Sequence, residues 1–273
     1  MRARIERGRA TVAPSKRERE YARKRQAKWD ERQRDKRDRR RRVGVLVAIL
    51  AVFALAAGTA LVAGLSSARS DDSAVDTGAT GTGCSPVSTD PRDGGDLPDP
   101  SAAEGRTWTA SLDLCVDGST ETIGLELDGQ QAPQAVASFV SLARASYFDA
   151  TACHRLVTQG IHVLQCGDPT ASGTGGPGYA YGPIENAPTA DVYPAGTLAM
   201  ARRGGDGASM GSQFFLVYED STIPSDAAGG YTVLGTVTSG LDTVQAVADA
   251  GTTDGAADGS PASPVIIEGV ETQ

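Results

Sequence analysis

Residues 153–169 read CHRLVTQGIHVLQCGDP, two short apolar runs at 153–157 and 161–166 that end in a Gly-Asp-Pro turn. Runs of this length between turn residues are typical of β-strands, here joined by a loop at 158–161. The stretch holds four side chains of metal-ligating types: Cys153, His154, His162 and Cys166. Neighbouring strand positions face opposite ways, so Cys153 and His154 should point apart. We therefore expect no metal site here.

Both sides of this stretch carry strand and helix patterns. Apolar residues alternate with polar ones over 108–116 and 123–127, which predicts two half-buried strands. The spacing of Val136, Phe139, Val140 and Ala143 predicts a helix that begins at Pro133. A second short helix is indicated by Leu241, Val244 and Ala248, and further short apolar runs lie at 197–201, 213–218, 231–237 and 265–270. Helices are too few for a parallel sheet, so the pattern favours a mainly β fold, a closed antiparallel barrel with two capping helices.

The N-terminal part of the chain is segregated by charge. Residues 1–42 hold 19 basic and 7 acidic residues, whereas the remainder holds 7 basic and 27 acidic ones. Residues 43–65 are uncharged and apolar, and a helix of that length spans a bilayer of about 30 Å. The positive-inside rule then predicts a single-pass plasma-membrane protein with a cytoplasmic N-terminus, anionic lipid heads beside the basic tail, and the domain from 107 to 273 outside the cytoplasm.

Residues 66–106 are rich in Ser, Thr, Asp, Gly and Pro without periodicity, which predicts a flexible acidic linker. The basic tail has only two aromatic residues, so no nucleic-acid partner is expected.

Two common catalytic patterns are unsupported. The stretch 173–178 reads GTGGPG, but a dinucleotide site needs this turn to open a helix, and Pro177 lies inside it. The two histidines of the domain have no acid and no nucleophile at a readable spacing, so a hydrolytic triad is unsupported as well.

Five blocks, taken in order, resemble the cyclophilin family of peptidyl-prolyl cis-trans isomerases. They are 153–169, the glycine stretch 175–178 (GGPG), 196–201 (GTLAMA), 211–215 (GSQFF) and 231–235 (YTVLG). The resemblance covers residues 107–270. It implies a cyclophilin-like barrel of eight strands and an isomerase of X-Pro bonds that needs no cofactor.

The resemblance also implies roles for single residues. Arg155, after the His of the His-Arg pair, takes the place of the family's catalytic arginine, and Gln165 and Gln213 those of its catalytic glutamines. Substrate-binding positions are implied for His162, Val163, Ala201, Arg202, Phe215, Ile223, Pro224 and Tyr231.

Several of these positions depart from the family's usual residues. His162 stands where an aromatic wall is usual, and Arg202 replaces an asparagine. Tyr231 stands where many members have a histidine, and its hydroxyl can still donate a hydrogen bond. Ile223-Pro224 occupies the region where many members place a tryptophan.

Three functions remain open at this stage. The first is a membrane-tethered foldase that isomerises X-Pro bonds in exported proteins. The second is a cyclophilin-fold binding or chaperone module that grips proline-containing polypeptides with little turnover. The third gives the basic tail a role in docking cytoplasmic partners.

All four cysteines follow the predicted membrane span, in a compartment where disulfides persist. Three pairings are possible. Cys84 with Cys115 would staple the linker to the first strand and leave Cys153 with Cys166. If Arg155 and Gln165 share a face of paired strands, however, Cys153 and Cys166 do not, so the second bridge stays open.

Overall fold

The structure is a computed structural model that describes residues 83–273. The predicted basic tail, the predicted span at 43–65 and the linker up to 82 lie outside the described residues. Within 83–273, neither α-helix combines the length and the apolar composition needed to cross a bilayer.

The chain from 83 onward is mainly β. Its helices are the 3-10 helix η2 (Pro100–Ala103), α2 (Pro133–Arg144) and α3 (Leu241–Ala250). Its strands are β1 (Thr107–Val116), β2 (Ser119–Asp128), β3 (Thr151–Ala152), β4 (Arg155–Val157), β5 (Val163–Cys166), β6 (Val192–Tyr193), β7 (Thr197–Met200), β8 (Phe214–Val217), β9 (Ser221–Thr222), β10 (Val233–Ser239), β11 (Asp258–Gly259) and β12 (Val265–Thr272).

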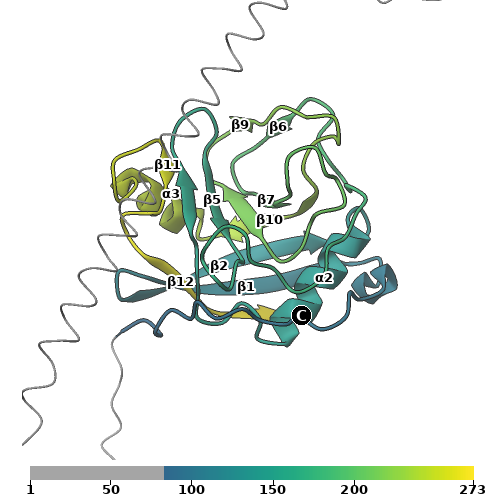
Figure 1. The fold of residues 1–273 in the computed structure, drawn as a ribbon, viewed down its shortest axis with the longest axis horizontal. Coiled ribbons are helices and arrows are strands. Elements are labelled where there is room, and N and C mark those ends of the chain that lie inside the picture. The colour runs from purple at the N-terminus through teal and green to yellow at the C-terminus, as the bar shows by residue number, and fades with distance from the viewer. Residues whose placement is uncertain (1–82) are drawn as a thin grey trace, which may run out of the picture. The chain divides into compact units, whose positions relative to one another are not determined.

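Ten of these strands form one curled antiparallel sheet, in the order β11-β4-β5-β8-β7-β10-β2-β1-β12-β3 (Figure 1). The expected closed barrel of eight strands is corrected in two respects. The sheet gains β3 and β11, and these two form its edges, so hydrogen bonding does not close the barrel. Both have only two residues, too few to produce a periodic signal in the sequence.

The two predicted α-helices are confirmed, and they lie at opposite ends of the sheet (Figure 1). Pro133 starts α2, and the Glu185 carboxylate accepts hydrogen bonds of 3.0 Å from the N–H groups of Gln134 and Ala135. These are among the N–H groups that a helix leaves unsatisfied at its start. Phe139 of α2 packs against Phe214 of β8, with ring centroids 5.5 Å apart, which fixes the helix to the sheet.

Residues 84–106, here called the strap, lie against the domain instead of extending as a coil. The Ser85 N–H donates to Glu268 (2.8 Å), and the Gly94 N–H donates to the Pro177 carbonyl (2.9 Å). The indole of Trp108 donates to the Ala103 carbonyl, which holds the end of the strap (2.9 Å). Such backbone contacts need no apolar periodicity, so composition alone predicts a linker where the chain is packed.

Buried apolar residues form two clusters. The larger fills the space between α2 and the sheet. The smaller consists of Val157, Val163, Tyr193, Ala199, Phe215, Val217 and Ile223. This second cluster forms the floor of the cavity that contains the predicted site.

Candidate active site

A cavity of about 500 Å³ opens beside β4, β5 and β8. Its apolar lining residues include Ile161, Val163, Ala201, Phe215, Ile223 and Tyr231. Its polar lining residues include His154, Arg155, Gln165, Ser172, Arg202 and Ser260. A cavity of this size with an apolar wall and a few convergent polar groups is typical of a ligand site.

The sheet register brings Arg155 and Gln165 together. Arg155 of β4 pairs with Gln165 of β5, which in turn pairs with Phe215 of β8. Directly opposed residues project their side chains to the same face. The Arg155 NH1 donates to Gln165 Oε1 (3.2 Å), and Gln165 Nε2 donates to Gln213 Oε1 (2.7 Å). The three predicted catalytic residues therefore form one hydrogen-bonded row, in which Arg155 and Gln165 line this cavity and Gln213 lines the neighbouring one.

The glycine stretch ends this row. Gln213 Nε2 donates to the Gly175 carbonyl (2.8 Å). The buried Asp168 carboxylate accepts from the N–H groups of Thr170 (2.7 Å) and Gly175 (3.0 Å). Burial alone raises the pKa of Asp168, but the hydrogen bond from the Thr170 hydroxyl and those from the two N–H groups outweigh it and hold the pKa below its ordinary value. A Cβ at Gly175 would lie 2.0 Å from Asp168 Oδ1, so this position requires glycine.

An acidic residue that carries no local sequence signal contacts the guanidinium of Arg155. Asp258 of β11 accepts from Arg155 Nε and NH2, both at 2.8 Å. These hydrogen bonds are the main reason that the pKa of Asp258 lies below its ordinary value. The two residues are 103 positions apart, so no local motif could have revealed the contact.

The apolar wall contains five of the residues at implied substrate-binding positions: Val163, Ala201, Phe215, Ile223 and Tyr231. Phe215 packs edge-on against Tyr231, with ring centroids 5.6 Å apart. Both come from the smaller apolar cluster or pack against it, so the wall is held by buried neighbours.

His162 and Pro224 are not among the residues that line the cavity. The His162 ring packs on Tyr218, with centroids 5.6 Å apart. Ile161 lines the cavity in its place, because Ile161, Val163 and Gln165 share one face in the alternation that leads into β5. Strict period-two counting back from Gln165 would have found Ile161. Pro224 is exposed.

Arg202 lines the cavity, but its donors are engaged within the protein. Its NH1 and NH2 donate to the Asp226 carboxylate (2.9 and 3.1 Å), and its Nε donates to the Gly230 carbonyl (2.8 Å). Its side chain is 1% exposed, and the guanidinium lies 4.6 Å from the centroid of the Tyr231 ring. Arg202 therefore lines the cavity and at the same time holds the segment 226–231.

His154 lies beside Arg155 and lines the cavity. Both of its ring nitrogens are buried and have no hydrogen-bond partner among residues 83–273. Burial is the main cause that lowers the pKa of His154, so the ring is neutral at pH 7. A neutral imidazole adds no charge next to the guanidinium.

Both disulfides considered from the sequence are present. Cys84 is bonded to Cys115, and Cys153 to Cys166. The face objection to the second bridge does not apply, because Cys153 lies outside β4 in the irregular segment that precedes it. This bridge ties the segment before Arg155 to the residue that follows Gln165.

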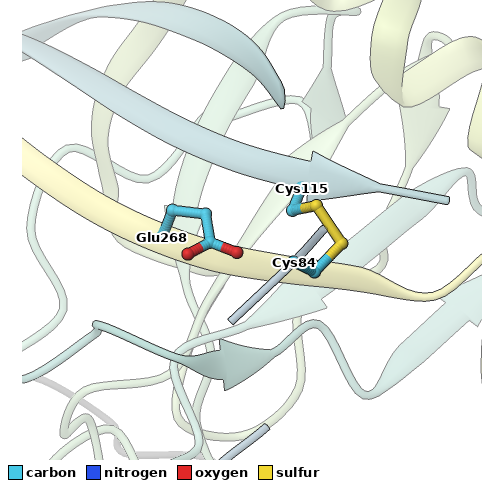
Figure 2. Close-up of side chains that lie close together, drawn as sticks. All are labelled: Cys84, Cys115 and Glu268. Atoms are coloured by element: carbon cyan, nitrogen blue, oxygen red, sulfur yellow. A yellow bond between two sulfur atoms is a disulfide. The ribbon is translucent and has the colours of Figure 1, made fainter. Parts of the chain in front are cut away.

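Cys84, Cys115 and Glu268 form a cluster of potential metal ligands (Figure 2). The two sulfurs are bonded to each other, and the Glu268 carboxylate accepts from the N–H and hydroxyl of Ser85. The cluster therefore anchors the start of the strap to β1 and β12.

Comparison with known proteins agrees with this geometry. A family model described as "Cyclophilin type peptidyl-prolyl cis-trans isomerase/CLD" matches residues 112–272. The "Probable peptidyl-prolyl cis-trans isomerase B" of Mycobacterium leprae is 42% identical over 181 residues, which are 62% of this chain and 59% of that protein. This chain thus spans less than two thirds of that relative. "Peptidyl-prolyl cis-trans isomerase B" of Bacillus subtilis is 40% identical over 129 residues, 47% of this chain and 83% of that protein.

A crystal structure of a cyclophilin type peptidyl-prolyl cis-trans isomerase from Cryptosporidium parvum has the same fold. It superposes with a TM-score of 0.50 at 23% identity, over 62% of this chain and 98% of the other. The fold, the hydrogen-bonded row at the cavity and the match over 112–272 lead to one conclusion: this chain belongs to the cyclophilin family of peptidyl-prolyl cis-trans isomerases.

Proposed function

We propose that this protein catalyses cis-trans isomerisation of X-Pro bonds in polypeptides. The observation that carries the proposal is the position of Arg155, whose guanidinium lies at the cavity beside the apolar wall and donates to Gln165. The reaction removes no proton and cleaves no bond. Its barrier of about 18–20 kcal/mol comes from the partial double-bond character of the amide.

Arg155 can lower this barrier by hydrogen bonding. As the amide twists, the lone pair returns to the proline nitrogen, and an N–H directed there stabilises the twisted state. Arginine suits this role because it stays charged and carries several donors in fixed directions. A stabilisation of about 5–7 kcal/mol would shorten a reaction of tens of seconds to milliseconds.

The rest of the cavity binds and orients the substrate. Phe215, Val163 and Ile161 hold the proline ring and exclude water, which strengthens every hydrogen bond at the rotating amide. Gln165 is held by its hydrogen bond to Gln213, and it orients the guanidinium by accepting a hydrogen bond from Arg155 NH1.

A protease-coupled assay on a short proline peptide tests this function. Wild-type protein should accelerate isomerisation, and Arg155→Ala should lower kcat/KM by about a hundredfold or more, as expected for the loss of a charged donor that stabilises the twisted amide. The matched control is Arg144→Ala, an exposed arginine at the end of α2. Binding of the peptide by wild type without any acceleration would support the binding-module alternative instead.

We further propose that the substrates are exported proteins and that residues 43–65 anchor the domain at the outer face of the plasma membrane. The uncharged span, the basic cluster before it and two disulfides support this location. In intact cells that make the full chain, added protease should digest the domain and leave residues 1–42 protected. Protection of the domain until the cells are lysed would contradict the proposal.

A further inference from the structure

The side-on edge of the Arg155 guanidinium is occupied by Asp258. Its two carboxylate oxygens accept hydrogen bonds from Nε and NH2, both at 2.8 Å, so the pairing is bidentate. Gln165 Oε1 accepts a hydrogen bond from NH1. One hydrogen on NH1 and the end-on hydrogen of NH2 then remain without a partner among residues 83–273.

The position of Asp258 is fixed by the backbone. β11 pairs with β4 so that Asp258 lies opposite Val157 and Gly259 opposite Leu156. The Thr158 N–H donates to the Ala257 carbonyl (2.8 Å) and thus holds the residue before Asp258. Asp258 therefore lies on the strand next to the strand of Arg155, and its short side chain is long enough to reach the guanidinium.

We propose that Asp258 is a positioning residue for the isomerase reaction: it occupies one edge of the Arg155 guanidinium and directs the other toward the rotating prolyl amide. The proposal rests on the proposed function. An arginine side chain has many rotamers, and ordering it in advance removes an entropic cost from the twisted state. Asp258 offsets the net charge of Arg155 but leaves the direction of the remaining N–H groups intact.

The pair is suited to this role more than to holding the fold. The side chains of Arg155 and Asp258 are 40% and 53% exposed, and ion pairs this exposed contribute little to folding stability. Replacing Asp258 should therefore leave the protein folded, so a change in activity can be assigned to the site.

The test combines kinetics with a direct view of the guanidinium. Asp258→Ala should lower kcat about tenfold with KM almost unchanged, because the proline ring is held by the apolar wall. Asp258→Glu should restore most of the loss, and Asp258→Asn, with one acceptor oxygen and no charge, should lie between. The control is Asp249→Ala, an exposed residue of α3.

Two further measurements distinguish positioning of the guanidinium from a general effect of Asp258 on the cavity. In an Arg155→Ala background, Asp258→Ala should have no further effect, since no guanidinium remains to be held. The Arg155 Nε–H should exchange slowly with solvent in wild type and faster in Asp258→Ala, a readout that needs no activity. Wild-type kinetics in Asp258→Ala, or an equal loss in the Arg155→Ala background, would overturn the proposal. An inactive wild type that still shows slow Nε–H exchange would contradict the proposed function alone.

Discussion

Arg155 and Gln165 are register partners on β4 and β5, and their side chains are hydrogen-bonded at 3.2 Å on the cavity side of the sheet. Gln165 also donates to Gln213 (2.7 Å), which is held by the Gly175 carbonyl (2.8 Å). The guanidinium is thus fixed from the sheet side by a row of amides and from the edge strand by Asp258. Substitutions in this row should change catalysis, whereas substitutions in the supports of the cavity wall and the strap should change stability.

Gln165→Ala should lower kcat/KM about tenfold, or about 1.4 kcal/mol, because both Arg155 and Gln213 lose a partner. Gln165→Glu keeps an acceptor for Arg155 and should lose less. Gln131→Ala, at an exposed position between β2 and α2, is the control and should behave as wild type in the same assay. Equal activity of Gln165→Ala and wild type would mean that the row does not orient the arginine.

Arg202→Lys should destabilise the protein by about 1–3 kcal/mol, because one ammonium cannot satisfy the Asp226 carboxylate and the nearby carbonyls together. The Tyr231 wall should loosen as well, which raises KM. Urea unfolding and peptide kinetics measure the two effects. Arg203→Ala, whose ion pair with Asp206 is exposed, should change neither quantity. A lysine variant with the stability and KM of wild type would contradict the role given to Arg202.

The Arg202–Asp226 pair should also make stability depend on pH. The hydrogen bonds from Arg202, with those from the N–H groups of Gly205 and Ala228, hold the pKa of Asp226 well below its ordinary value. A lowered pKa in the folded state stabilises the protein above the unfolded value of about 3.9, and this contribution is lost as the pH falls through the folded pKa.

The gap in urea midpoint between wild type and Asp226→Asn should therefore be larger at pH 7 than at pH 3. The exposed Asp96, replaced by Asn, is the control and should show no gap at either pH. A gap of equal size at both pH values would show that the ion pair is not the source of the effect.

Replacing Cys84 and Cys115 with serine should lower the free energy of unfolding by about 2–4 kcal/mol, since the bridge closes a loop of tens of residues. The bridge fastens the strap to β1 (Figure 2), and neither of its cysteines lines the cavity. The kcat/KM of the folded variant should equal that of wild type. A loss of activity at temperatures where the variant is still folded would indicate that the strap supports the site.

The sequence predicts most of this fold, and what it misses has physical causes. Strand alternation and helix spacing locate β1, β2, α2 and α3, because each buries one regular face. The edge strands β3 and β11 are too short for a pattern. The strap is held by a disulfide and by backbone hydrogen bonds, neither of which leaves a periodic trace in composition.

The same holds for the site. Arg155, Gln165, Gln213 and Phe215 follow from local blocks, and the register then brings them together. Asp258 was missed because its contact with Arg155 spans 103 positions. The resemblance implies substrate-binding positions for both His162 and Val163, although adjacent strand residues cannot both face the cavity.

Arg155 should accelerate rotation of the bound amide without being needed for capture of the peptide. Exchange spectroscopy by NMR measures both, because it reports the cis-trans exchange rate on the protein separately from the dissociation constant. Arg155→Ala should bind a proline peptide within about threefold of wild type, with on-protein exchange slower by about a hundredfold. Exchange at the wild-type rate in this variant would contradict the role of the guanidinium in catalysis.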